Sequence, residues 1–292
     1  MGFVYRGFDS VPDTQYPDRN RILYQINWSA KEGFSGIELG CPSFDYFRRS
    51  YDREFTEKVR VALSNNSLQV SQFKADFLIP LLRKNSASPN SNLDLVLEKA
   101  RDLSCKVVSF AASLIPSAPM PHGYLFPGGP PSRIEIPGSF SWSSSWQNYV
   151  ESISTIADRA RAYEVQVAVE PRPREMISST DGLLSLFKEV GTQNLGALVN
   201  TAFLFAQREH IPLALRKLEG RIFATHLSDS DGLLEHHWAP GEGKIDWAEV
   251  IKAFNSVNYS HLHTLDIGIV GNPEFDFRQG KSFLDRTTLT MN

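Results

Sequence analysis

Four polar residues, each at the end of a short apolar run, could together hold a divalent cation. They are Glu170, Asn200, His226 and Asp266. Carboxylate oxygens, a carboxamide oxygen and an imidazole nitrogen are suitable ligands for Mn²⁺, Mg²⁺ or a similar cation. If the four runs are neighbouring parallel strands of a barrel, their carboxyl ends open on one crevice, and the four side chains converge there. The sequence therefore predicts a metal site built from four strand ends.

The elements that would position these residues alternate regularly along the chain. Eight β-like runs occupy residues 3–5, 36–39, 68–70, 106–110, 165–169, 195–199, 221–224 and 262–265. Over 292 residues, the mean interval is 292/8, or about 36 residues, which accommodates a strand, a helix and two loops. This alternation predicts an α/β fold, a closed (β/α)8 TIM barrel. The alternative is an open doubly wound sheet, but no G-x-G-x-x-G motif follows the first run.

The intervals between the runs carry helix signals. Residues 146–160 repeat apolar side chains at spacings of three and four, which predicts a helix with one face against the sheet. Asp246 and Glu249 form a capping box at the start of a later helix. Gly191 is a candidate C-terminal cap for the helix that starts near Thr180.

One long segment, residues 116–141, is rich in Pro and Gly and follows the fourth run. Loops of this length often serve as lids, so we expect a lid-like loop on the catalytic face, with a plain surface excursion as the alternative. No linker composition divides the chain, so we expect a single TIM-barrel domain spanning residues 1–292.

Composition limits the possible partners. The net charge is −3, from 30 Lys and Arg against 33 Asp and Glu, and there is no long basic run, so we expect no nucleic-acid partner. The apolar runs are shorter than a membrane span requires, and the first residues do not resemble a secretory signal. With only Cys41 and Cys105, a disulfide framework is excluded. We therefore expect a cytoplasmic protein with a small-molecule substrate, and a homodimer as the commonest oligomeric state.

Four motifs make the second half of the chain similar to a known family. They occupy residues 169–172, 198–203, 226–232 and 240–247, and they include His-x-x-Asp and Gly-x-Gly-x-Ile-Asp-Trp. The chain resembles the xylose isomerase-like TIM-barrel superfamily, most clearly over residues 145–267. That superfamily includes sugar isomerases, ketose 3-epimerases, dehydratases and endonuclease IV-type enzymes. The net charge of −3 disfavours an endonuclease, which must bind a polyanion.

The resemblance implies a metal and a mechanism. Its metal ligands would be Glu170, Asn200 in the place of an Asp, His226, and Asp266 in the place of a Glu, holding Mn²⁺, Mg²⁺, Co²⁺ or Zn²⁺. Glu170 and Asp266 would also be catalytic, removing and returning a proton next to a carbonyl through an ene-diolate. Isomerisation, epimerisation and dehydration all remain open.

Candidate substrate-binding residues come from two sources. The resemblance implies Glu38, Asp229, His237 and Phe203, which stands where the family often has a His. Arg172 could clamp an anionic group, and Trp238 could stack on a sugar ring. Lys74 and Asp76, near the end of the third run, are weaker candidates.

Two hypotheses follow. The first is a metal-assisted isomerase or epimerase of a sugar-like polyhydroxy carbonyl compound. The alternative is a divergent member with weak or no metal, acting as a lyase or dehydratase of specialised metabolism or as a non-catalytic binding protein. The alternative is supported by the paired loss of Asp and His around the sixth run, where Asn200 and Phe203 stand. Asn200 also removes one negative charge from the ligand set, and Asp266 is shorter than Glu by about 1.5 Å.

Overall fold

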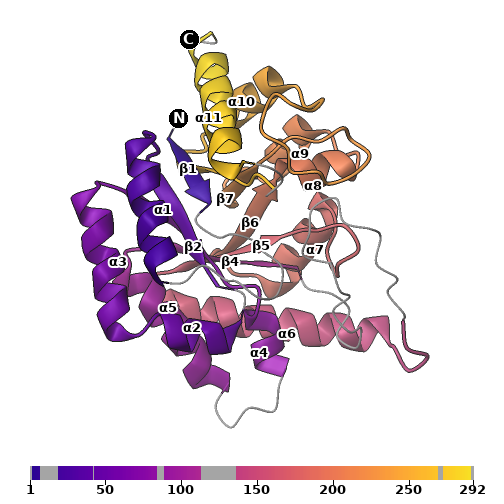
Figure 1. Cartoon of the computed structure of the whole chain (residues 1–292). Coiled ribbons are helices and arrows are strands. Elements are labelled where there is room, and N and C mark those ends of the chain that lie inside the picture. The colour runs from indigo at the N-terminus through magenta and orange to yellow at the C-terminus, as the bar shows by residue number, and fades with distance from the viewer. Residues whose placement is uncertain are drawn as a thin grey trace.

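The computed structural model describes residues 2–6, 19–41, 43–83, 89–112, 136–268 and 272–290. Eight parallel strands form a closed barrel in sequence order, and the last strand pairs with the first (Figure 1). The strands are β1 (Phe3–Arg6), β2 (Gly36–Gly40), β3 (Gln69–Lys74), β4 (Val107–Ala111), β5 (Gln166–Glu170), β6 (Leu195–Asn200), β7 (Ile222–Leu227) and β8 (His263–Leu265). Each overlaps a run expected from the sequence, so the predicted (β/α)8 barrel is confirmed.

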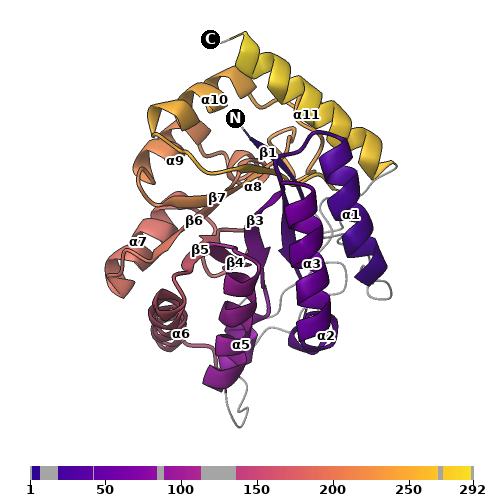
Figure 2. The same cartoon turned by 90° about the vertical axis from the view of Figure 1, so that its left-hand side faces the viewer.

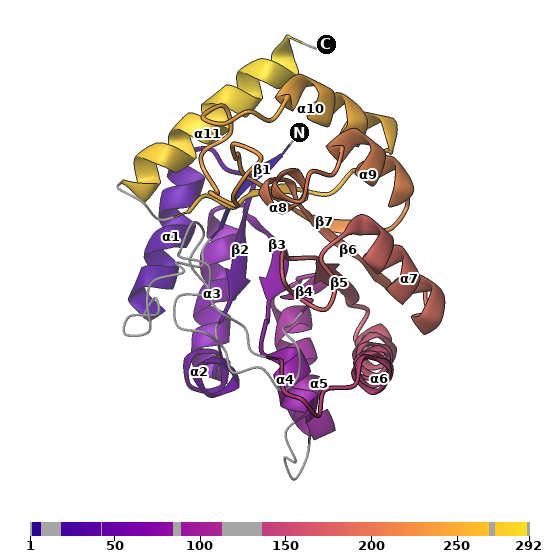
Figure 3. The ribbon, with the colours of Figure 1, turned by 90° about the vertical axis from the view of Figure 1, so that its right-hand side faces the viewer.

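Helices surround the barrel. Figures 2 and 3 show them standing outside the strands on every side that the two views present. They are α1 (Arg19–Lys31), α2 (Phe44–Ser50), α3 (Arg53–Asn65), α4 (Leu78–Arg83), α5 (Pro89–Asp102), α6 (Trp142–Ala162), α7 (Thr180–Val190), α8 (Thr201–Ala206), α9 (Ile211–Lys217), α10 (Trp247–Ser256) and α11 (Pro273–Leu289). The last helix meets the end of the first, where Arg278 donates to Glu32 at 2.8 Å. Of the helices described, none combines the length and the apolar character that crossing a bilayer would require.

The local signals read from the sequence correspond to real helix ends. Gly191 ends α7 in the left-handed conformation with φ of +71°. Asp246 caps α10 by accepting from the Glu249 amide at 3.0 Å. Most of the expected lid, residues 116–141, lies outside the described residues, and the single-domain expectation for residues 1–292 stays a prediction.

The strand tips that carry the polar residues stand above an apolar layer. Alternate residues of a strand face the same way, so the residue two positions before each tip lies beneath it inside the barrel. At these positions β5, β6 and β7 have Ala168, Leu198 and Ala224, which belong to one small buried cluster. An apolar layer therefore lies below the polar end of the barrel, and the polar tips face a common mouth.

Candidate active site

Three of the predicted ligands converge at the mouth of the barrel. His226 Nδ1 lies 2.7 Å from Glu170 Oε1 and 3.3 Å from Asp266 Oδ2. One ligand atom from each of the three residues lies within 4.8 Å of the others, and all three side chains are buried. Ligand atoms about 3 Å apart are what a cation with bonds of about 2.1 Å requires. Two carboxylates and an imidazole thus fit a divalent cation in both spacing and chemistry.

The far side of the His226 ring is held by a second carboxylate. Glu38 on β2 lies with Oε2 2.7 Å from His226 Nε2, and the same oxygen accepts from Gln72 Nε2 on β3 at 2.7 Å. A carboxylate on the distal nitrogen orients a metal-binding histidine and leaves its other nitrogen for the ion. Glu38 is fully buried behind His226, a position that suits an orienting contact, and its predicted substrate contact stays a prediction. Gln72 was not among the residues predicted from the sequence. It lies two positions before Lys74 in the same strand and therefore faces the barrel interior as Lys74 does.

Asn200 lies in the site with its amide nitrogen toward the carboxylates. Its Nδ2 donates to Glu170 Oε1 at 3.0 Å and to Asp266 Oδ2 at 3.1 Å. Its Oδ1 accepts from the Phe203 amide at 3.3 Å and caps α8. The oxygen predicted as a metal ligand is therefore engaged in the helix cap, and coordination through it requires the amide to turn over.

The second oxygen of Glu170 meets two permanent cations. Its Oε2 accepts from Lys74 Nζ at 3.0 Å and from Arg172 at 2.7 and 2.8 Å. Asp76 completes the group, 3.1 Å from Lys74 and 3.3 Å from Arg172, while accepting from the Ala111 amide at 2.7 Å. Arg172 was predicted to clamp an anionic substrate. It instead binds carboxylates of the protein itself.

These contacts control ionisation. Burial alone would raise the pKa of Glu170, but the charges of Arg172 and Lys74 outweigh it and hold that pKa well below its usual range. His226 acts in the same direction. Burial likewise opposes ionisation of Asp76, yet Lys74 and Arg172 lower its pKa to about 2. Both carboxylates are therefore anionic at neutral pH.

Asp229, another predicted substrate residue, is an anchor for the loop after β7. Its Oδ1 accepts from the amides of Ser230 at 2.9 Å and Ile245 at 3.1 Å. Its Oδ2 accepts from the Gly241 amide and from Trp247 Nε1, both at 2.8 Å. The side chain is fully buried and is used by these four donors, which give it a structural role in this loop, and its predicted substrate contact stays a prediction.

The remaining predicted residues lie beside or outside this group. His237, with φ of +54°, places Nδ1 3.1 Å from Asp266 Oδ2. Phe203 packs edge-on against His237 with ring centroids 4.9 Å apart, and the Arg172 guanidinium lies 5.7 Å from the Phe203 ring centroid. These contacts keep His237 and Phe203 as neighbours of the mouth. Trp238 instead stacks on His236, with centroids 4.1 Å apart.

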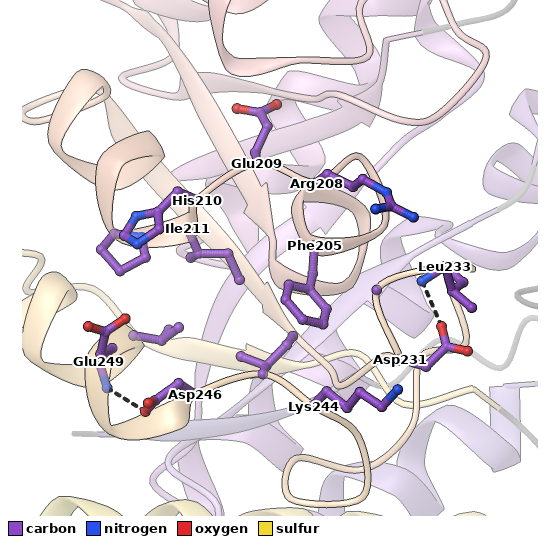
Figure 4. Close-up of a pocket in the computed structure, with 14 residues that line it drawn as sticks. Phe205, Arg208, Glu209, His210, Ile211, Asp231, Leu233, Lys244, Asp246 and Glu249 are labelled. Carbon is purple, nitrogen blue, oxygen red and sulfur yellow. Dashed lines mark hydrogen bonds between the residues drawn. The ribbon is translucent and has the colours of Figure 1, made fainter.

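A separate groove of about 510 Å³ lies outside the barrel, between α8 and α9 on one side and α10 on the other (Figure 4). Its floor is apolar, with Phe205 and Ile211 among the lining residues. Two of its carboxylates serve local structure. Asp231 accepts from the Leu233 amide at 2.8 Å, and Asp246 caps α10. The convergent, buried polar groups lie at the barrel mouth instead.

Comparison with known proteins agrees with this architecture. The sequence matches the xylose isomerase-like TIM barrel family over residues 26–287. Fructoselysine 3-epimerase from Shigella flexneri is 24% identical over 125 residues, which is 42% of this chain and 45% of that protein. The chain thus matches less than half the length of this curated relative.

Solved structures extend the likeness to the whole fold. D-psicose 3-epimerase from Clostridium cellulolyticum H10 has a TM-score of 0.75 at 14% identity, covering 98% of this chain and 99% of that chain. The 3-keto-D-glucoside 4-epimerase from E. coli has a TM-score of 0.74 at 16% identity, with the same coverage of both chains. At these identities the similarity shows the fold alone.

Proposed function

Because the chain belongs to the xylose isomerase-like TIM barrel family, we propose that it is an epimerase or isomerase of a sugar-like polyhydroxy ketone. The observation that carries the proposal is the convergence of Glu170, His226 and Asp266, with ligand atoms within 4.8 Å of one another. These three residues would hold a divalent cation, Mn²⁺, Mg²⁺, Co²⁺ or Zn²⁺. When bound, the cation would polarise the substrate carbonyl and its neighbouring hydroxyl.

The protein's own residues divide the remaining tasks. Glu38 fixes the ring of His226 through Nε2, so that Nδ1 faces Glu170 and Asp266. Epimerisation needs a base on one face of the reacting carbon and an acid on the other, and Glu170 and Asp266 are proposed as this pair. Because Oε2 of Glu170 is already bound by Lys74 and Arg172, we assign proton removal in the faster direction to Asp266.

The substrate class comes from the named relatives. The similar proteins include 3-epimerases of fructoselysine and D-psicose. We therefore propose a ketose or ketose derivative that reacts at C3. Phe203 at the mouth favours a substrate with an apolar or bulky substituent. The proposal includes a small-molecule substrate, a cytoplasmic location and a homodimer.

The test is solvent exchange at the reacting carbon. The purified protein is loaded with Mn²⁺ and incubated in D₂O with D-fructose, D-tagatose, D-psicose and a fructosamine. We expect one substrate to yield its 3-epimer with deuterium at C3, detected by NMR, and the Glu170→Gln variant to yield none. Absence of exchange with every ketose by folded, Mn²⁺-loaded protein would overturn the proposal.

A second candidate is a lyase or dehydratase that needs little or no metal. It is favoured because Lys74 and Arg172 already balance the charge of Glu170 at Oε2, while Asn200 Nδ2 donates a hydrogen bond to Oε1. The same incubations in the presence of a chelator separate the candidates. A dehydrated product that forms equally with and without the chelator supports the second candidate and contradicts the first.

A further inference from the structure

The two oxygens of Glu170 face two different environments. Oε1 is 2.7 Å from His226 Nδ1 and 3.0 Å from Asn200 Nδ2, on the side where the candidate ligands converge. Oε2 is bound by the Lys74 ammonium at 3.0 Å and by the Arg172 guanidinium at 2.7 Å. A carboxylate can bind a cation through one oxygen or through both. In this chain the second oxygen is already occupied by charged donors.

The reach of Lys74 depends on small residues in the strand between. β4 separates β3 from β5, so Lys74 must span two strand spacings, about 9.6 Å, together with the Glu170 side chain. The register pairs Lys74 with Ser109 and Glu170 with Ala111, and these two β4 residues share one face of their strand. Their short side chains leave the path open, and Lys74 itself is 3% exposed.

Asp76 fixes the far side of this group. It lies 3.1 Å from Lys74 and 3.3 Å from Arg172, so two cations and two carboxylates form a closed, formally neutral square. The square is buried at Lys74 and Glu170, and the Arg172 side chain is 14% exposed. Such a group does not rearrange without leaving a buried charge unpaired, which is strongly unfavourable.

We propose that Lys74 and Arg172 are positioning residues of the cation site, which hold Oε2 of Glu170 so that only Oε1 serves as a ligand, and whose charges weaken cation binding. The inference rests on the proposed function, since it takes the Glu170, His226 and Asp266 group as the place where the cation binds. Two effects act in the same direction: one oxygen is withheld, and two positive charges next to the site repel a dication.

The experiment measures Mn²⁺ binding to the purified full-length chain by calorimetry, without substrate. The proteins are wild type, Lys74→Met, which removes the charge at similar length, and Lys74→Arg, which retains it. Lys99→Met is the matched control, because Lys99 pairs with Asp102 at 3.3 Å on the outer helix α5. We expect Lys74→Met to bind Mn²⁺ about 10- to 100-fold more tightly than wild type. Lys74→Arg and Lys99→Met should stay within about threefold of wild type.

A merely structural role for Lys74 predicts the opposite sign, because a disturbed site binds less well. Unchanged or weaker binding by a folded Lys74→Met protein overturns the inference and leaves the proposed cation site standing. If neither wild type nor any variant binds Mn²⁺, both the inference and the metal-assisted function are overturned. Should Lys74→Met fail to fold, Lys74→Gln provides the same comparison, because it removes the charge and keeps a polar side chain at this buried position.

Discussion

Two buried carboxylates near the carboxyl ends of β5 and β7, Glu170 and Asp229, each contact four partner residues, but the partners differ in kind. Asp229 accepts from three backbone amides and one indole N–H. Glu170 meets an imidazole, a carboxamide, an ammonium and a guanidinium, all of them on side chains. Both are fully buried.

The two carboxylates differ in whether their hydrogen-bond donors can give way to a cation. Backbone amides are fixed donors, so Asp229 stabilises one conformation of the loop that connects β7 to α10. Side-chain donors can turn or give way to a cation, and His226 already presents a nitrogen that suits one. Although both carboxylates are buried and hydrogen-bonded, the fixed backbone donors indicate a structural role for Asp229. The side-chain donors indicate a chemical role for Glu170.

The sharpest way to break this comparison is Glu170→Gln. The substitution replaces a carboxylate by a neutral carboxamide at the candidate cation site, so we expect Mn²⁺ affinity to fall about 100-fold or more. It also leaves Lys74 and Arg172 with Asp76 as their remaining carboxylate in the described square, and we expect a cost of about 2–4 kcal/mol in the free energy of unfolding. Calorimetric Mn²⁺ titration and urea unfolding measure the two effects.

Asp229→Asn is the matched carboxylate-to-amide change. Its new NH₂ group faces N–H donors and leaves two of them unsatisfied, so we expect a similar loss of about 2–4 kcal/mol in urea unfolding. The Mn²⁺ affinity of the folded protein should stay within about threefold of wild type. Comparable loss of Mn²⁺ binding in both variants would show that the two carboxylates belong to one functional unit, contrary to the comparison.

Asn200→Asp sharpens the Glu170 side. The new carboxylate would lie close to Glu170 and Asp266, whose oxygens now accept from Asn200 at 3.0 and 3.1 Å, and could still cap α8. We expect Mn²⁺ to bind about 10- to 100-fold more tightly, because a dication relieves the repulsion. In the absence of metal the same repulsion should lower the free energy of unfolding by about 1–2 kcal/mol. Unchanged Mn²⁺ affinity with unchanged stability would mean that this position does not face the ion.

The sequence was sufficient to predict which polar residues lie at the strand ends. Glu170, Asn200 and His226 each end an apolar run, and the topology of parallel strands brings such ends together whatever the details of packing. It was insufficient for roles that depend on side-chain direction. Asp229 belongs to a motif with His226, yet its partners are amides up to 16 residues further along the chain and the Trp247 indole N–H 18 residues further along, and no local pattern reveals them.

The Lys74 contact illustrates the same limit. Lys74 and Glu170 are 96 residues apart and lie on strands separated by a third strand, so their meeting depends on register and on the short side chains of Ser109 and Ala111. Because alternate residues of a strand face the same side, the sequence could have predicted that Gln72 and Lys74 of β3 both face the barrel interior. It could not have shown that Arg172 pairs with Glu170.

The smallest expected effect separates Asp76 from Glu170 within the square. Because Lys74 and Arg172 lower the pKa of Asp76 from 3.8 to about 2, its charge stabilises the fold above pH 3.8, and this contribution is lost as the pH falls toward 2. The Asp76 side chain is 32% exposed, and solvent screening weakens this stabilisation. We expect the charge to contribute about 1 kcal/mol to the free energy of unfolding at pH 3. The variant Asp76→Asn lacks it at every pH. Urea unfolding gives the free energy of unfolding of wild type and variant at about pH 6 and about pH 3. The difference between the two proteins should be smaller at pH 3 by about 1 kcal/mol. A constant gap would mean that Asp76 is not held by the two cations, and that the square is anchored at Glu170 alone.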